Sequence, residues 1–398
     1  MTPLLTGWGR TAPTSATLVE ATVADVPALL RDHPARGVIA RGLGRSYGDA
    51  AQNAGGTVLA PIPGPTTIHT AEDGSPLVTA AAGTSLHDLM ATLLAERLFV
   101  PVTPGTRYVT LGGAVAADIH GKNHHRDGSF GEQLVSLDLV TADGGLHTIG
   151  PDTDPTLFWA TVGGMGLTGV ILGATLQLLR VETAYVLEDI ERCSDVDDCL
   201  ARMSARDDEY RYSVAWIDCL ARGSQLGRSV LMRGDHAPRE ALPARTRGEP
   251  LERRRGLKLP APPWAPNGLL RRETVAAFNE LYFRRAPREE RGRLVGLDPF
   301  FYPLDAVEGW NRMYGSRGFL QYQFVVPFGS EDALREALER FSGAGVASFL
   351  AVLKRFGTGS GMISFPMPGW TLALDMPAGD PTLGPLLDGL DALVAEAG

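Results

Sequence analysis

The 398-residue sequence has few cysteines, few lysines and no long apolar run, and each shortage excludes a class of protein. Its three cysteines, Cys193, Cys199 and Cys219, are odd in number and lack CxxC spacing, so neither a disulfide framework nor a zinc site is indicated. No stretch reaches the roughly 18 apolar residues of a membrane span, and the first residues lack the basic and apolar regions of a secretory signal. We therefore expect a soluble chain, cytoplasmic or peripheral to the cell membrane.

Lysine is the rarer of the two strong bases. The chain carries 37 Lys and Arg against 46 Asp and Glu, for a formal charge of -9, and only Lys122, Lys258 and Lys354 are lysines. The acidity argues against nucleic acid as a partner, because neutralising phosphates needs a basic face. The compact ammonium of lysine can reach a substrate hydroxyl or phosphate where the planar guanidinium of arginine fits less well, so each lysine is a functional candidate. The alternative is a surface lysine retained by chance.

One segment reverses the charge balance. Residues 239–293 hold fourteen Lys and Arg against seven Glu, and they include the run LKLPAPPWAPNG with Leu257, Leu259 and Trp264. Basic charge mixed with apolar residues suits an anionic lipid surface. The alternative interpretation is a solvated, mobile connection.

The order of expected elements predicts an α+β protein with two domains, 1–180 and 181–398. The first half alternates short strands with glycine-rich turns, and Ser85 with Asp88 predicts a capped helix over 86–97. In the second half we expect strands in 212–220, 318–327, 346–357 and 369–377, with helices over 331–341 and 385–397. Strands mixed with few helices are typical of a largely antiparallel sheet.

Three glycine-rich loops stand beside predicted strands, at 41–49, 104–131 and 163–169. Glycine lets a backbone turn tightly and point its N–H groups at a ligand, and several such loops favour a long ligand such as a dinucleotide. Single loops of this kind are often only structural turns. His120, His124 and His125 also suggest a metal, but no carboxylate stands at helical spacing from His120 and two adjacent histidines point to opposite faces, so we predict no metal site.

Polar residues are spaced two apart on two predicted strands. Gln321 and Gln323 share one face, as do Leu350, Val352, Lys354 and Phe356 on the next strand. Polar groups on an apolar strand need hydrogen-bond partners, which a sugar phosphate would supply; a solvated sheet edge is the alternative.

The segments RGLGRSYGDAAQNAGG, PGTRYVTLGGAVAADIHGKNHHRDGSFG and FWATVGGMGLTGV resemble the FAD-binding domain of the vanillyl-alcohol-oxidase class of flavoproteins. With YSVAWID, FLQYQF, SFLAVLKRFG and SFPMPGW, the resemblance extends to the branch of that class that oxidises polyprenylphosphoryl-β-D-ribose, over nearly the whole chain. It implies a two-domain FAD-binding fold with an antiparallel-sheet substrate domain. It also leaves the periplasmic side of the membrane open as a location.

The resemblance implies which residues contact FAD. In covalent members of the class a histidine of the first loop is bonded to the flavin, and Arg45 stands at that place here, so we predict dissociable FAD. The implied cofactor residues are Arg41, Gly42, Leu43, Gly44, Arg45, Ser46, Tyr47, Gly48, Gly105, Thr106, Thr110, Gly112, Gly113, Ala117, Asp118, Gly121, Asn123, His124, Gly128, Ser129, Gly131, Gly166, Gly169 and Val170.

The implied reaction converts the ribose 2'-hydroxyl to a ketone, with hydride passing to the flavin, as the first half of an epimerisation to an arabinose donor. Quinone or oxygen would reoxidise the flavin, and a keto-sugar reductase would be the partner. The implied catalytic residues are His120, Lys122, Lys354 and Tyr47, and sequence cannot rank them as the base. The implied substrate-binding residues are Trp216, Gln321, Gln323, Phe301, Leu350, Val352, Phe356 and Ala373.

Two departures from the family pattern carry expectations. Ala373 stands where relatives often have a cysteine that attaches inhibitors, so turnover is expected to survive and thiol-directed inhibitors are expected not to bond. Relatives also continue past the last helix with another active-site lysine, so weakened FAD affinity and reduced activity are expected of this chain. The alternatives are another FAD-linked alditol or aldonolactone oxidase, favoured by covalent flavin, or a flavin-binding protein with impaired catalysis.

Overall fold

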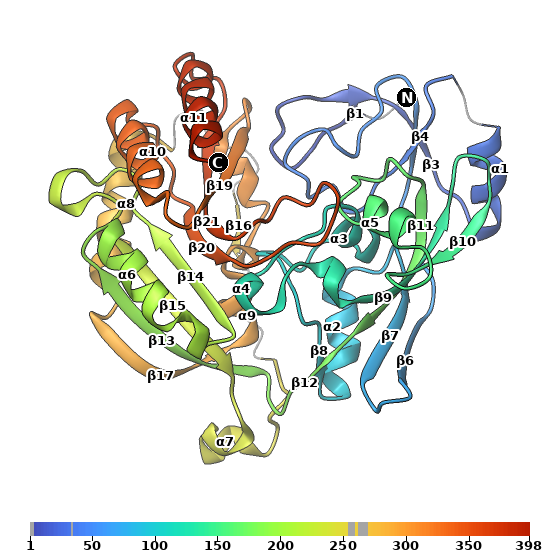
Figure 1. Ribbon diagram of the computed structural model, residues 1–398, viewed down its shortest axis with the longest axis horizontal. Coiled ribbons are helices and arrows are strands. Elements are labelled where there is room, and N and C mark those ends of the chain that lie inside the picture. Colours follow the sequence, from blue (N-terminus) through green and yellow to red (C-terminus); the bar gives the residue numbers. More distant parts are fainter. Residues whose placement is uncertain (1–3, 33–34, 254–258, 262–269) are drawn as a thin grey trace.

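The computed structural model describes residues 4–32, 35–253, 259–261 and 270–398. Two sheets dominate it, one in each half of the chain, and Figure 1 shows the first half on the right and the second half on the left. The five-stranded sheet has the order β10-β9-β11-β7-β6, and the seven-stranded sheet has the order β17-β13-β15-β14-β20-β21-β19. This combination of antiparallel sheets and helices confirms the predicted α+β class.

Neighbouring strands of the first sheet are all antiparallel. Its strands are β6 (Thr66–Thr70), β7 (Pro76–Ala81), β9 (Leu134–Val140), β10 (Leu146–Ile149) and β11 (Val170–Gln177). The helices α2 (Leu86–Ala95), α3 (Leu111–Ala116) and α5 (Pro155–Thr161) bury their apolar side chains against one face of it. The predicted helix begins as expected, because the Ser85 side chain accepts a hydrogen bond from the N–H of Asp88 at 3.1 Å.

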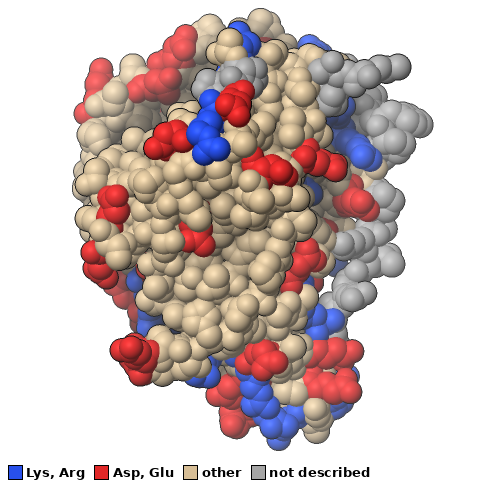
Figure 2. Space-filling view, turned by 90° about the vertical axis from the view of Figure 1, so that its right-hand side faces the viewer, with Lys and Arg blue, Asp and Glu red and all other residues tan. Residues whose placement is uncertain are grey.

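The other face of this sheet is lined with hydroxyls. Thr67, Thr79, Thr175 and Ser136 stand opposite one another on four neighbouring strands, and the Thr79 and Thr175 hydroxyls are 2.8 Å apart. Figure 2, which views the molecule from the side of the first half, shows few charged side chains near the centre of the surface that it presents. This face is therefore largely polar, and it also carries the carboxylate of Asp138, which accepts the hydroxyl of Thr148 at 2.7 Å.

A small parallel sheet precedes the first large one. It consists of β3 (Thr17–Val19), β5 (Thr57–Leu59) and β4 (Val38–Ala40), with α1 (Val26–Arg31) in the connection that parallel pairing requires. The short elements of the remaining chain are β1 (Leu4–Leu5), β2 (Thr14–Ser15), β8 (Leu98–Phe99), β12 (Leu179–Arg180), β16 (Leu259–Pro260), β18 (Val307–Glu308), α4 (His124–Asp127), α7 (Ala244–Arg247), α9 (Leu297–Phe301) and the 3₁₀ helix η7 (Trp310–Tyr314).

The second sheet separates a helical side from a polar side. Its strands are β13 (Tyr185–Cys193), β14 (Tyr212–Ile217), β15 (Ser229–His236), β17 (Glu289–Gly296), β19 (Phe319–Pro327), β20 (Ala351–Phe356) and β21 (Gly369–Pro377). The helices α6 (Val196–Arg206), α10 (Glu331–Ala344) and α11 (Leu383–Ala397) cover one face and form a second apolar core with Leu353, Leu372 and Leu374. The opposite face points towards the loops of the first half.

Much of the segment predicted to be mobile is regular structure. Residues Arg272–Arg285 form α8, which buries Val275 and Asn279, and the charges that follow lie on β17. Apolar positions at helical spacing therefore pack this part of the segment against the sheet, while the mobility expected over 239–293 stays a prediction. Leu257, Lys258 and Trp264, which suggested a lipid surface, lie outside the described residues. Among the described residues, no helix combines the length and apolar character needed to cross a bilayer.

Candidate active site

The three glycine-rich loops meet around the short helix α3. A Cβ on Gly42 would lie 2.4 Å from Oγ1 of Thr110, the residue whose side chain caps α3 by accepting the N–H of Gly113. At the other end of the helix, the N–H of Met165 donates to the carbonyl of Ala116 at 2.8 Å. Segments more than 60 residues apart in sequence are thus packed onto one helix.

The first loop is held in place by its arginines. Nη1 of Arg41 donates to the carbonyl of Ala51 at 3.0 Å and Nη2 to the carbonyl of Thr6 at 2.5 Å, while Gly44 adopts a φ of +67° that favours glycine. The guanidinium of Arg45 lies 3.9 Å from the ring centroid of Trp8, a cation–π contact. Leu43, Ser46 and Gly48 complete the loop and are exposed or nearly so.

The second loop is tied to the connection between β20 and β21. Asp118, at a φ of +38°, accepts the N–H of Gly131 at 2.8 Å and the hydroxyl of Ser364. Nδ1 of the buried His124 accepts the N–H of Gly357 at 3.1 Å, and its Nε2 lies 3.2 Å from the hydroxyl of Ser129. Burial lowers the pKa of His124 to about 4, so this ring is neutral and structural at neutral pH.

The other predicted cofactor residues lie along the same loops. A Cβ on Gly105 or Gly48 would meet nothing within 4 Å, whereas one on Gly112 or Gly121 would clash with neighbouring atoms. The hydroxyl of Thr106 donates to Asp305 at 2.7 Å, an anchor that the sequence did not reveal. The remaining positions are Ala117, Asn123, Gly128, Gly166, Gly169 and Val170, of which Val170 begins β11 and is buried in an apolar cluster with Val26, Leu59 and Val140.

The polar face of the second sheet faces these loops. Strand pairing sets Lys354 opposite Thr371, Val352 opposite Ala373, Ala373 opposite Gln323, and Asp375 opposite Gln321. Side chains on one face of a sheet alternate along each strand, so all of these share one side. Leu350 directly precedes β20 and Phe356 ends it.

His120 is at the centre of this group. Its Nε2 lies 3.3 Å from Nε2 of Gln323, its Nδ1 lies 3.4 Å from Nζ of Lys354, and its ring packs edge-on against Phe356 at 4.7 Å. Burial, and then the charge of Lys354, lower the pKa of His120 well below its usual value. The imidazole is therefore neutral at neutral pH and can accept a proton or a hydrogen bond.

Two buried lysines lie in this region, Lys354 in contact with His120 and Lys122 near enough for its charge to act on Lys354. Nζ of Lys122 donates to the carbonyl of Phe300 and lies 4.3 Å from the centroid of its ring. Burial lowers the pKa of Lys122 to about 8, and burial together with the charge of Lys122 lowers the pKa of Lys354 to about 8. Both amines therefore titrate near physiological pH, which is typical of groups at functional sites.

Tyr47 brings the first loop to the same face. Its ring packs edge-on against Phe319 at 5.1 Å, and burial followed by the nearby carboxyl of Asp375 raises the pKa of its phenol well above its usual value. Gln321 donates to Oδ1 of Asp375 at 2.7 Å. The predicted catalytic residues Tyr47, His120, Lys122 and Lys354 thus come from two loops and one strand and line a single region.

Two predicted substrate residues lie apart from this group. Trp216 donates through Nε1 to the carbonyl of Phe349 at 3.1 Å and packs on Tyr282. Phe301 is buried in the core against Phe99 and Tyr212, while its neighbour Phe300 is the residue that contacts Lys122. The aromatic residue that contacts Lys122 is therefore Phe300, one position before the Phe301 that the resemblance implied.

Sequence reasoning missed Phe300, Ser364, Asp375 and Tyr314. The sequence could have placed Asp375 on the polar face, because it follows Ala373 by two residues on a predicted strand and so lies on the same side. The contacts of Phe300 and Ser364 join segments distant in sequence and carry no local signal. Within the described part of the chain, no group of three His, Cys, Asp or Glu side chains is placed to hold a metal ion.

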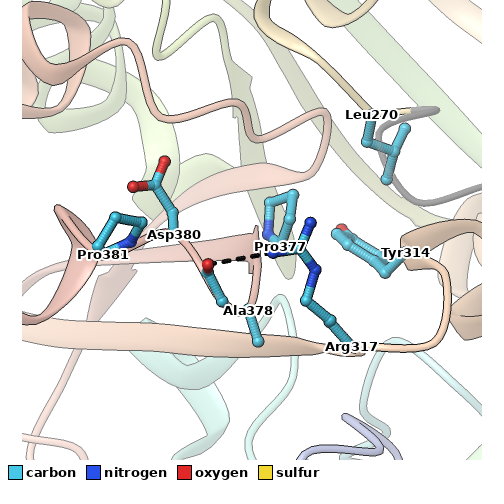
Figure 3. Close-up of a pocket in the computed structure, with 8 residues that line it drawn as sticks. Leu270, Tyr314, Arg317, Pro377, Ala378, Asp380 and Pro381 are labelled. Atoms are coloured by element: carbon cyan, nitrogen blue, oxygen red, sulfur yellow. Dashed lines mark hydrogen bonds between the residues drawn. The ribbon is translucent and has the colours of Figure 1, made fainter.

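A pocket of about 310 Å³ opens where β21 ends. Figure 3 shows Tyr314 and Arg317 on one side of it and the turn from Pro377 to Pro381 on the other, with Arg317 donating to the carbonyl of Gly379 at 3.3 Å. The ring of Tyr314 stacks on Phe319 at 4.3 Å, next to Tyr47. The pocket therefore adjoins the region of Tyr47 and Gln321.

Comparisons with known proteins agree on the chemistry of the first half. A family model described as an FAD binding domain matches residues 14–150. The decaprenylphosphoryl-β-D-ribose oxidase of Mycolicibacterium smegmatis is 44% identical over 385 residues, covering 94% of this chain and 83% of that protein. An uncharacterized protein of Streptomyces coelicolor is 44% identical over 79% of this chain and 86% of its own length. Cytokinin dehydrogenase 4 of Arabidopsis thaliana is 31% identical over 37% of this chain and 29% of its own.

Proposed function

The chain belongs to the family of decaprenylphosphoryl-β-D-ribose oxidases, and we propose that it oxidises the 2'-hydroxyl of polyprenylphosphoryl-β-D-ribose to the 2'-keto sugar with FAD. The observation that carries the proposal is the His120, Lys354 and Gln323 contact, a buried set of proton-handling and hydrogen-bonding groups facing the glycine-rich loops. The reaction is the first half of an epimerisation that yields an arabinose donor for cell-wall arabinan.

The three loops fit a dinucleotide. Gly48 and Gly105 leave open space where any other residue would place a Cβ, and the loops converge from distant parts of the chain onto α3. We assign the pyrophosphate to the first loop, and the flavin to the second loop with Gly166 and Gly169. FAD supplies the acceptor for the hydride that leaves the sugar carbon. The covalent members of the class bond the flavin through a histidine of this loop, and the permanently protonated guanidinium of Arg45 is no nucleophile, so we assign a dissociable cofactor.

The remaining chemistry belongs to the side chains. The sugar hydroxyl must lose a proton, and the neutral His120 offers an acceptor nitrogen at the centre of the polar face. Lys122 and Lys354, with pKa values lowered to about 8, hold protons at Nζ that stabilise negative charge developing on the oxygen. Gln323 fixes the sugar through its amide and positions His120. Tyr47 and Ala373 line the same region and would contact the sugar ring.

The proposal extends to three partners. A quinone or oxygen would reoxidise the flavin, a reductase would convert the keto sugar to the arabinose epimer, and a peripheral contact with the membrane would give access to a lipid-linked substrate. The similarity to the mycobacterial oxidase supports the substrate assignment.

A product-trapping experiment tests the reaction. The FAD-loaded protein would be incubated with a short-chain polyprenylphosphoryl-β-D-ribose and a quinone, and the product reduced with borodeuteride. We expect deuterium at C2' of the sugar, because only the 2'-ketone takes it up there. Deuterium at C1' or C5', or turnover of free ribitol in place of the lipid-linked sugar, would contradict the proposal and favour an alditol oxidase.

A further inference from the structure

Asp375 is a fully buried carboxyl that the reaction described above leaves without a role. It lies on β21 on the same face as Thr371 and Ala373, with an exposed fraction of 0%. Its Oδ1 accepts the amide of Gln321 at 2.7 Å, but its Oδ2 has no hydrogen-bond partner among the described residues. An oxygen buried without a donor costs free energy, so a carboxyl kept in this state is poised for a donor from a ligand.

The groups around Asp375 are uncharged donors. The titratable side chains that face it are the phenols of Tyr47, from the first loop, and Tyr314, from η7, and the pKa of each is raised by burial and then by Asp375. Tyr314 is 4% exposed and its hydroxyl also lacks a partner among the described residues. Burial raises the pKa of Asp375 itself to about 7, and no described lysine, arginine or histidine pairs with it.

This set of groups is suited to a sugar hydroxyl. One carboxylate oxygen needs a donor, one phenol needs a partner, and the amide of Gln321 holds the carboxylate in place, while Phe319 supplies an apolar wall. A hydroxyl both donates and accepts, so it satisfies Asp375 and Tyr314 together. A cationic ligand would satisfy Asp375 but would offer no acceptor to the hydroxyl of Tyr314.

The spacing along β21 selects which hydroxyl. Residues two apart on a strand are separated by about 7 Å, so Asp375 lies that far along β21 from Ala373. Ala373 pairs with Gln323, whose amide contacts His120, the proposed acceptor of the hydroxyl proton, so the oxidised position is assigned to the level of Ala373. The 3'-hydroxyl neighbours the oxidised one on the ring and is too close to reach this point. We propose that Asp375, held by Gln321, binds the primary hydroxyl at C5' of the ribose, across the ring from the oxidised position; the assignment rests on the proposed function.

The test compares the natural sugar with its 5'-deoxy analogue. Binding of short-chain polyprenylphosphoryl ribose would be measured on dithionite-reduced holoenzyme, which cannot turn over, and kcat and KM would be measured separately with a quinone. We expect Asp375→Asn and Asp375→Leu to weaken binding by roughly 10- to 100-fold, the size of a hydrogen bond to a charged group, with kcat changed far less. The 5'-deoxy sugar is expected to bind all three proteins with similar weakness.

The matched control is Asp391→Asn. Asp391 accepts the hydroxyl of Tyr322 at 2.7 Å on the helical side of the same sheet, so its variant is expected to bind both sugars as the unchanged protein does. An equal loss on 5'-deoxygenation in the Asp375 variants and the unchanged protein would overturn the assignment. So would unchanged binding with a collapse of kcat, which would place Asp375 at the reacting proton. An unchanged protein that neither binds nor oxidises the natural sugar would overturn the proposed function, and this assignment with it.

Discussion

Nζ of Lys354 lies 3.4 Å from Nδ1 of His120, so two basic groups share one buried contact at the centre of the polar face. They cannot both be protonated without repulsion, and burial penalises the charge on each. The pair therefore offers one acceptor and one donor side by side. This is the arrangement needed to remove a proton from a hydroxyl while stabilising the oxygen that it leaves.

Lys354→Met is expected to slow flavin reduction by polyprenylphosphoryl ribose by roughly 100-fold or more, because a positioned proton-handling group contributes at least that factor. The pKa of His120 is expected to rise towards its usual value, since the neighbouring charge is removed. Anaerobic stopped-flow absorbance gives the rate, and NMR of the histidine ring gives the pKa.

Arg355→Met is the matched control for this lysine. Arg355 is the next residue on β20 and pairs with the exposed Asp208 at 2.8 Å, so its loss removes a surface ion pair of little consequence. A Lys354→Met protein that reduces its flavin as fast as the Arg355→Met protein would exclude a role for the ammonium.

Gly105→Ala is expected to separate FAD binding from folding. The added Cβ would meet no protein atom within 4 Å, so the melting temperature of the FAD-free protein is expected to change by only about 2 °C. FAD affinity is expected to fall by roughly tenfold or more, because the methyl enters the space assigned to the cofactor. Fluorescence titration with FAD measures the second effect. Gly384→Ala, equally open but on α11, is the control and is expected to bind FAD normally.

The buried Asp207 predicts a pH dependence of stability. Burial raises its pKa to about 7, above the ordinary value of 3.8, so between these values the folded protein binds more protons than the unfolded one. Stability therefore falls as pH rises through this window. Between pH 5 and pH 8, Asp207→Asn is expected to gain about 1–3 kcal/mol in free energy of unfolding relative to the unchanged protein. Urea unfolding of both proteins at the two pH values measures it, and a constant difference would contradict the assignment.

The cysteines predict resistance to thiol-directed inhibitors. Cys193, Cys199 and Cys219 are at most 1% exposed, and burial raises the pKa of Cys219 to about 12. Mass spectrometry of the native protein is expected to find no adduct, whereas Ala373→Cys, which places a thiol on the polar face, is expected to gain one. An adduct on the unchanged protein would show that one of the three buried thiols becomes accessible.

Regular elements were predictable where periodicity is strong. The helix expected over 86–97 is observed at Leu86–Ala95, and the strand expected in 369–377 is observed at Gly369–Pro377, because an N-cap and an alternating pattern act locally. The strand expected in 346–357 begins only at Ala351. The residues before it include Ser348, whose hydroxyl bonds the carbonyl of Leu350 and so interrupts the ladder.

The candidate site was predictable in its residue types and not in its contacts. Spacing of two placed Gln321 with Gln323 and Lys354 with Val352, as the sheet register shows. The contact of Lys122 with Phe300 joins residues 178 apart, and that of Asp118 with Ser364 joins residues 246 apart. Such contacts form only when the two halves of the chain pack together, so no local sequence pattern predicts them.

The most direct measurement is the visible spectrum of the FAD-loaded protein during anaerobic addition of a short-chain polyprenylphosphoryl-β-D-ribose. The account predicts flavin absorbance that acid precipitation releases into the supernatant and that the lipid-linked sugar bleaches, while free ribitol leaves it unchanged. Flavin that stays with the acid precipitate, or absorbance that persists with the lipid-linked sugar, would contradict the account.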